Sequence, residues 1–288
     1  MGQRFRDSMV LSMGVVVAAV VLAALPSAGQ GQALNAPGAS PAFRAARSPH
    51  GDGRPDLGGI WFAANSANWN LEGHDAHQGP AANVAGFFSV RAGQSVVVGD
   101  AIPYQPWALA KKKENAANWM TLDPEAKCFL PGVPRATYTP YAFQIIQSPD
   151  VILMAYEYAT AGRRILLGDQ IGAKIEAPFD TWMGWSRGRW EGDTLVVDVG
   201  GFNGQTWLDR AGNFYSETAR VVERYTPTSP DHLNYEATIE DPKVFTRPWQ
   251  IRMPLYRLKE PNAQLLEFKC VEFVEELMYG HLSKPKTN

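Results

Sequence analysis

A series of short, strand-like segments in the second half of the chain constrains its fold most. These segments are rich in Val, Ile, Tyr, Phe, Trp and Thr, which favour β-strands. Turn signals such as Glu191–Asp193 and Lys259–Asn262 separate several of them by two to six residues, which favours antiparallel hairpins because parallel crossovers need a dozen residues or more. The predicted strands are 141–147, 151–158, 163–167, 183–190, 194–199, 219–225, 232–239, 250–258 and 264–271.

A meander of about eight or nine strands must curl into a barrel or split into a sandwich to remove its edges. We predict a mainly β fold: a single antiparallel barrel domain over residues 56–288, with an irregular N-terminal arm and a C-terminal helix. The first strand-like run is 56–64, and a helix is predicted over 106–119, where Pro opens a run of good helix formers. The C-terminal helix is expected over 273–282, packed outside the barrel or plugging one end.

The N-terminus carries the features of a secretory signal peptide, residues 1–33. Arg4 and Arg6 precede an apolar run over 9–25, and small residues follow it. An uncleaved membrane anchor is the alternative, but the Lys or Arg of a stop-transfer segment does not follow the run. Residues 34–55, rich in Pro, Gly, Ala and Ser, predict a flexible leader. The expected location is periplasmic or extracellular, with no membrane span after signal removal.

Charge and cysteine content narrow the function classes. Without residues 1–33 the net charge changes from −2 to −3, because two arginines and one aspartate are lost. This near-neutral value argues against a nucleic-acid-binding surface. Export argues against ATP and NAD(P)H, and no cofactor is predicted. Cys128 and Cys270 are the only cysteines, and they form either a disulfide or two buried free thiols, since two thiols alone cannot make a tetrahedral zinc site.

The chain contains six motifs, each of which occurs once: Asp123–Arg135 (DPEAKCFLPGVPR), Trp190–Asp198 (WEGDTLVVD), Gly201–Asn203 (GFN), Thr206–Asp209 (TWLD), Glu223–Tyr225 (ERY) and Asp241–Trp249 (DPKVFTRPW). In this combination the chain, over roughly residues 56–280, resembles a family of secreted bacterial proteins with no assigned reaction. Family members often carry His where this chain has Tyr215 and Arg220, which puts histidine-dependent chemistry there in doubt. The strand pattern also resembles lipocalin-type barrels (calycins), so the expected fold is a lipocalin-like barrel, but a fold does not fix a function.

The familiar enzyme motifs do not occur in the sequence: G-x-S-x-G, H-E-x-x-H, C-x-x-C, the P-loop and the dinucleotide fingerprint. His74 and His77 are three residues apart and would share a face on a helical turn, where Glu72 or Asp75 would be a further metal ligand. The surrounding sequence is typical of a loop. Two exposed loop histidines are therefore favoured, and no metal site is predicted.

Glu157 is the first candidate catalytic residue. Alternation along its predicted strand places it on the same face as Val151 and Leu153. If that face lines the barrel, the carboxylate is buried and needs a partner, and Arg163 or Arg164 lies just across a turn. Two interpretations stay open: an acid/base carboxylate held beside an arginine, or a structural cross-strand ion pair.

Further candidates lie in loops and aromatic segments. Asp180 lies two residues before Trp182. This spacing would place a base beside a ring that stacks on a flat substrate; the alternative is an Asp that caps backbone groups in a turn. Asn203 and Asp209 flank Trp207 in a loop, where function is often carried, and Asx turns are the alternative. The full predicted set comprises Glu157, Asp180, Arg163 and Tyr215 as catalytic residues, and Arg135, Tyr138, Trp182, Asn203, Trp207 and Asp209 as substrate-binding residues.

The favoured function is an exported, cofactor-independent enzyme that uses acid/base chemistry (elimination, hydrolysis or ether/ester cleavage) on a small aromatic or apolar molecule. Ionisable residues within aromatic-rich strands motivate it, in a chain with 11% aromatic residues and nine Trp. Glu157 or Asp180 would be the base, and Arg163 or Arg135 would hold developing negative charge. The alternative is a non-catalytic periplasmic binding protein for a hydrophobic small molecule. A structural envelope protein with a filled barrel is a third possibility.

Overall fold

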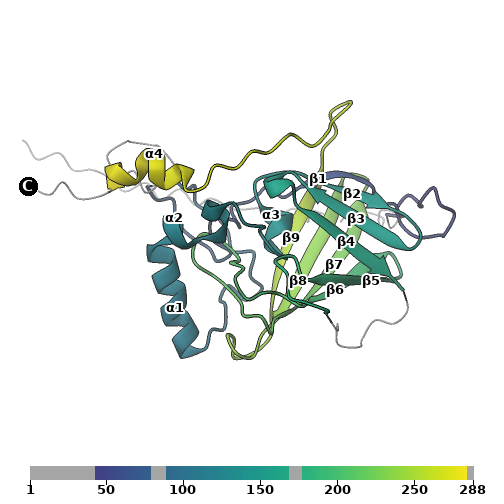
Figure 1. Ribbon diagram of the computed structural model, residues 1–288. Helices are drawn as coiled ribbons and strands as arrows, with labels where there is room; N and C mark the ends of the chain where they lie inside the picture. The colour runs from purple at the N-terminus through teal and green to yellow at the C-terminus, as the bar shows by residue number, and fades with distance from the viewer. Residues whose placement is uncertain (1–42, 79–88, 169–176, 284–288) are drawn as a thin grey trace, which may run out of the picture. The chain divides into compact units, whose positions relative to one another are not determined.

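The computed structural model describes residues 43–78, 89–168 and 177–283, and the predicted signal peptide lies outside these ranges. Within them, nine strands form a closed barrel in sequence order (Figure 1). The barrel closes because β1 pairs with both β2 and β9. The strands are β1 Gly59–Phe62, β2 Phe143–Gln147, β3 Val151–Tyr156, β4 Gly162–Leu167, β5 Trp185–Glu191, β6 Thr194–Gly200, β7 Arg220–Ser229, β8 His232–Glu240 and β9 Trp249–Arg257. The predicted β-barrel fold is confirmed.

One pair of strands departs from the predicted antiparallel meander. β4 and β5 run parallel, from Ile165 opposite Ser186 to Leu167 opposite Gly188. A parallel pair needs a long crossover connection, and the segment 168–184 provides it. The other neighbouring strands pair antiparallel as predicted.

The predicted strand 264–271 is not formed. β9 already pairs with β1, so the closed barrel offers no free edge to a further strand. Residues 259–273 run instead as an irregular segment. A disulfide between Cys128 and Cys270 holds this segment and decides between the two alternatives for the cysteines.

The helices lie mostly outside the barrel. The predicted helix 106–119 is present as α1 (Pro106–Ala117), and a break at Asn118 separates it from α2 (Trp119–Leu122). The C-terminal helix α4 (Val274–Ser283) lies against α2, not on the barrel or at its end (Figure 1). No helix in the described ranges combines the length and the apolar character that crossing a bilayer requires.

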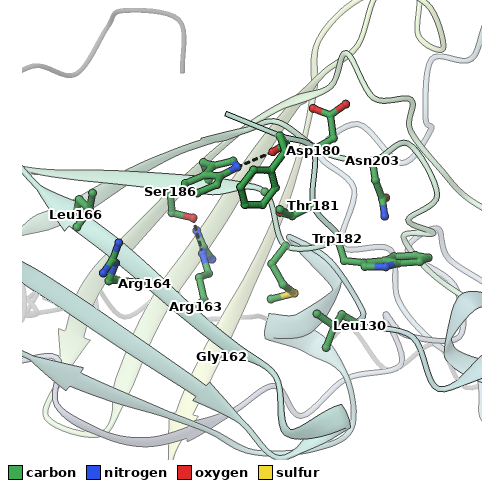
Figure 2. Close-up of a pocket in the computed structure, with 14 residues that line it drawn as sticks. Leu130, Gly162, Arg163, Arg164, Leu166, Asp180, Thr181, Trp182, Ser186 and Asn203 are labelled. Atoms are coloured by element: carbon green, nitrogen blue, oxygen red, sulfur yellow. Dashed lines mark hydrogen bonds between the residues drawn. The ribbon is translucent and has the colours of Figure 1, made fainter. Parts of the chain in front are cut away.

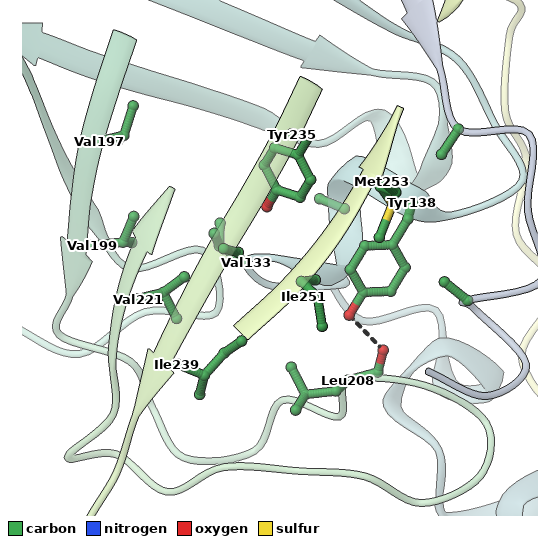
Figure 3. Close-up of a cluster of buried hydrophobic side chains, with 14 of the residues drawn as sticks. Val133, Tyr138, Val197, Val199, Leu208, Val221, Tyr235, Ile239, Ile251 and Met253 are labelled. Atoms are coloured by element: carbon green, nitrogen blue, oxygen red, sulfur yellow. Dashed lines mark hydrogen bonds between the residues drawn. The ribbon is translucent and has the colours of Figure 1, made fainter. Parts of the chain in front are cut away.

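Inward-facing side chains fill the centre of the barrel (Figure 3). Alternate residues of β8 and β9 are buried, as the period of two predicts, whereas five consecutive residues of β6, Leu195–Val199, are buried. The short helix α3 (Arg135–Tyr138) is buried among them, and the Tyr138 hydroxyl donates to the Leu208 carbonyl oxygen at 2.8 Å. Core side chains from β6 to β9 include Val197, Val199, Val221, Tyr235, Ile239, Ile251 and Met253. A ligand site must therefore lie at the wall or rim of the barrel.

The folded domain begins before the predicted boundary at residue 56. In residues 43–55, predicted as part of a flexible leader, the Arg54 guanidinium donates to the Pro149 carbonyl oxygen in the β2–β3 turn at 2.8 Å. Arg47 pairs with Asp193 in the β5–β6 turn at 2.6 Å. These contacts fix the segment against the barrel, a role that its Pro- and Gly-rich composition did not indicate.

Candidate functional site

A pocket of about 580 Å³ lies beside the N-terminal ends of β4 and β5 (Figure 2). The two strands pair only from Ile165 and Ser186 onward, and residues preceding this pair on both strands line the pocket. The Thr181 N–H donates to the Gly201 carbonyl oxygen and the Asn203 N–H donates to the Thr181 carbonyl oxygen, both at 3.0 Å, which brings a further loop to the edge of the pocket. The lining residues are Leu130, Gly162, Arg163, Arg164, Leu166, Phe179, Asp180, Thr181, Trp182, Met183, Gly184, Trp185, Ser186 and Asn203.

Aromatic and branched apolar side chains form much of this pocket. Trp182 stacks on Phe129 with ring centroids 5.0 Å apart, and Phe179 meets Trp185 edge-on at 5.3 Å. Phe179 is 64% exposed and Leu166 is 47% exposed. Large apolar side chains that remain exposed around a concave surface are typical of a site for a ligand or partner. The shape and composition suit a flat or branched apolar molecule.

The pocket brings together Arg163, Asp180, Trp182 and Asn203 from the predicted set. Asp180 is exposed at the rim (Figure 2), and it supplies the only carboxylate among the described lining residues. Within the described ranges this carboxylate makes no hydrogen bond or ion pair. It is therefore free to accept a hydrogen bond from a bound molecule.

A buried polar network that includes Arg163 lies in the barrel interior. The Arg163 guanidinium binds the Glu223 carboxylate through Nη2 and donates from Nε to Ser186 Oγ at 2.8 Å. Glu223 also accepts hydrogen bonds from Tyr225 at 2.9 Å and Tyr235 at 2.8 Å. Burial raises the pKa of both tyrosines, and the Glu223 charge raises it further. The hydroxyls therefore stay protonated and act as donors.

Glu157 does not face the barrel interior, so the condition for a buried carboxylate beside Arg163 or Arg164 is not met. β3 ends at Tyr156, and its buried residues are Ile152, Met154 and Tyr156. The odd-numbered residues therefore face the outside of the barrel, and Glu157 follows on that side. The Glu157 carboxylate accepts backbone hydrogen bonds from Ala142 at 3.2 Å and Leu266 at 2.8 Å. It stabilises the irregular C-terminal segment and does not pair with Arg163.

Arg135 belongs to a separate, buried ion cluster. It binds Asp123 through two hydrogen bonds of 2.7 and 2.8 Å and Glu125 at 2.6 Å. Glu125 also accepts from Arg210 at 3.1 Å, whose guanidinium lies over the Trp69 ring. Burial alone would raise the pKa of Glu125, but the two arginines lower it below its ordinary value. These pairings leave Arg135 engaged with protein carboxylates.

The remaining predicted residues lie in packed loops. Asp209 is fully buried and accepts from the Leu71 N–H at 2.8 Å, and burial raises its pKa to about 6. Tyr215 is fully buried and donates to the Val133 carbonyl oxygen at 2.7 Å. Trp207 is buried as well, like Tyr138 in the core. None of these four lines the pocket near β4 and β5.

His74 and His77 lie in an irregular segment, as predicted, and both line a smaller pocket of about 310 Å³ with Arg210. Their ring centroids are 6.2 Å apart. Within residues 43–78, 89–168 and 177–283, no group of three or more His, Cys, Asp and Glu side chains is arranged to hold a metal ion.

The sequence interpretation missed Glu223 and Ser186. A signal for Glu223 was present, because alternation in its strand places it on one face with Val221 and Tyr225. No comparable signal marked Ser186, whose importance comes from its bond to Arg163. Neither a protein-family model nor a curated protein sequence matches this chain.

Proposed function

We propose that the protein binds a small aromatic or apolar molecule in the pocket beside β4 and β5. The observation that carries this proposal is the exposed apolar wall around Trp182 and Phe179. A flat ligand that covers these rings removes apolar surface from water, at about 25 cal/mol per Å². Among the functions predicted from the sequence, non-catalytic binding is the one that the residues lining the pocket can perform without any additional residue.

The binding proposal is tested by titrating aromatic molecules and following the indole N–H signals of Trp182 and Trp185 by NMR. We expect Trp182→Ala to weaken binding roughly tenfold or more, because a buried ring contributes about 1.5–3 kcal/mol. Trp107→Ala is the matched control, since Trp107 is an exposed tryptophan on α1 outside the pocket. Equal weakening by both substitutions, or binding that shifts neither indole signal, would contradict the proposal.

Acid/base catalysis on the bound molecule is the second candidate, supported by the free Asp180 carboxylate at the rim. Asp180 would act as the base and Trp182 would hold the ring. The test is turnover of a panel of aromatic ethers and esters by the wild-type protein and by Asp180→Asn. Product formation that Asp180→Asn abolishes supports the enzyme, whereas binding without product supports the carrier.

We further propose that the protein is exported and belongs to the secreted bacterial family that its motifs resemble. The Cys128–Cys270 disulfide supports an oxidising compartment, where such bonds persist. Fractionation of producing cells and N-terminal sequencing of the mature chain test export. A full-length chain recovered from the cytoplasm would contradict it.

A further inference from the structure

The floor of the pocket holds hydrogen-bond donors that the described residues leave unused. Ser186 Oγ accepts from Arg163 Nε at 2.8 Å, so its own hydrogen points elsewhere, and no described residue accepts it. Arg163 Nη1 is also buried without a hydrogen-bond partner. A buried donor without an acceptor is unfavourable, which makes such a place suited to an acceptor atom of a ligand.

The charge around these donors is already balanced. Arg163 binds Glu223, a fully buried carboxylate. A ligand carboxylate would be a second anion beside the same guanidinium, and it would also meet Asp180 at the rim. Arg164 also lines the pocket, from the exposed side of β4, where its charge offsets that of Asp180, so the lining residues leave no net positive charge for a ligand carboxylate. A neutral oxygen accepts the hydrogen bond without adding a buried charge.

We infer that the pocket selects an aromatic or apolar molecule with a neutral carbonyl oxygen, as in a ketone, ester or amide, which accepts a hydrogen bond from Ser186. This inference rests on the proposed binding function. Ser186 lines the pocket and its hydroxyl hydrogen has no acceptor among the described residues, whereas the Arg163 guanidinium is already bound to Glu223, so the Ser186 hydroxyl is the donor that we assign to the ligand. The hydrogen bond from the guanidinium polarises this hydroxyl and makes it a stronger donor.

Three probes of similar size test the ligand class: acetophenone with a carbonyl, ethylbenzene with no acceptor, and benzoate with a carboxylate. Dissociation constants come from NMR titration of the indole signals of Trp182 and Trp185. We expect acetophenone to bind roughly tenfold or more tightly than ethylbenzene, which is about 1.4 kcal/mol, and more tightly than benzoate. Tightest binding of benzoate would overturn the inference.

Substitutions then locate the donor. Ser186→Ala should bring acetophenone to within about threefold of ethylbenzene, while Ser186→Thr, which keeps the hydroxyl, should retain the preference. Ser148→Ala is the matched control, because it deletes a hydroxyl in the β2–β3 turn, away from the pocket. An unchanged preference in Ser186→Ala overturns the inference. Equal binding of all three probes by the wild-type protein overturns it but leaves the proposed function standing, whereas no binding of any probe ends both.

Discussion

At the scale of single residues, the Arg163–Glu223 ion pair dominates the energetics beneath the pocket. Both side chains are essentially removed from water. Their mutual attraction and the hydroxyl donors of Tyr225 and Tyr235 offset the cost of desolvating two charges. A buried pair of this kind adds little net stability, but removing one partner leaves the other charge uncompensated.

We therefore expect Arg163→Met alone to lower the free energy of unfolding by about 3–5 kcal/mol, and the double substitution Arg163→Met with Glu223→Gln to restore most of it. Urea denaturation measures both. The control is the exposed pair of Arg47 and Asp193, whose side chains are 47% and 43% exposed, and Arg47→Met should cost about 1 kcal/mol or less. A double variant as unstable as Arg163→Met would show that the loss comes from packing and not from charge.

The sequence indicated that Glu157, if buried, would pair with Arg163 or Arg164, but it did not reveal the carboxylate that Arg163 does bind. Glu157 is close along the chain, whereas Glu223 lies on β7, which is not a sheet neighbour of β4. Contact across the interior depends on how the closed sheet curves, and local alternation contains no information on that. The same holds for Arg135, whose partners Asp123 and Glu125 lie in the same motif but were not recognised as its ion pairs.

At the scale of elements, the disulfide is the main restraint on the irregular segment 259–273. It joins residues that are 142 apart in the sequence. Weaker contacts also hold the segment, such as that between the rings of Phe268 and Tyr141, whose centroids are 5.2 Å apart. We expect Cys128→Ser with Cys270→Ser to increase trypsin cleavage after Lys259 or Lys269 on the order of tenfold, because the freed segment opens locally.

The readout for that variant is mass spectrometry of the first fragments, with cleavage at Lys111 and Lys113 on α1 as the internal control. The barrel closes through β1 and β9 without this segment, so fragments from cleavage outside the segment should appear at the wild-type rate. A uniform acceleration at all sites would mean that the disulfide supports the whole domain.

Strand positions were predictable because alternation and turn residues are local properties, and most predicted bounds agree with the structure within two residues. The parallel β4–β5 pair was not predictable, since a long connection can return the chain to either end of the sheet. The segment 264–271 has strand-like composition but no edge to join. Pairing partners are decided by closure, which is a property of the complete sheet.

At the scale of the whole molecule, the closed sheet places the candidate site at its wall. A barrel of this strand number has an interior that side chains can fill, and α3 contributes to that filling. The sequence over Arg135–Tyr138 shows no period that predicts its entry into the core. The sequence therefore could not indicate that the interior is filled, nor that a pocket lies where β4 and β5 are not yet paired.

The buried Asp209 links the parts of the molecule outside the barrel and makes global stability depend on pH. It accepts hydrogen bonds from Leu71 in the N-terminal arm and from Asn213, which in turn accepts from the Tyr104 hydroxyl at 2.9 Å. Burial raises its pKa to about 6 in the folded protein, against about 3.9 in an unfolded chain. Because the folded-state pKa is the higher one, this residue's contribution to stability is full below about pH 3.9 and is lost as the pH rises through about 6.

Asp209→Asn removes this titration. The free energy of unfolding of the wild-type protein, minus that of Asp209→Asn, should therefore be about 2 kcal/mol larger at pH 4.5 than at pH 7.5, so that the wild-type protein is relatively more stable at the lower pH. Urea denaturation of both proteins at the two pH values measures this difference, and titration of other groups, such as Glu125, cancels in the comparison. A difference of the opposite sign would mean that the folded protein holds Asp209 ionised, with Asn213 and the Leu71 N–H outweighing the cost of its burial.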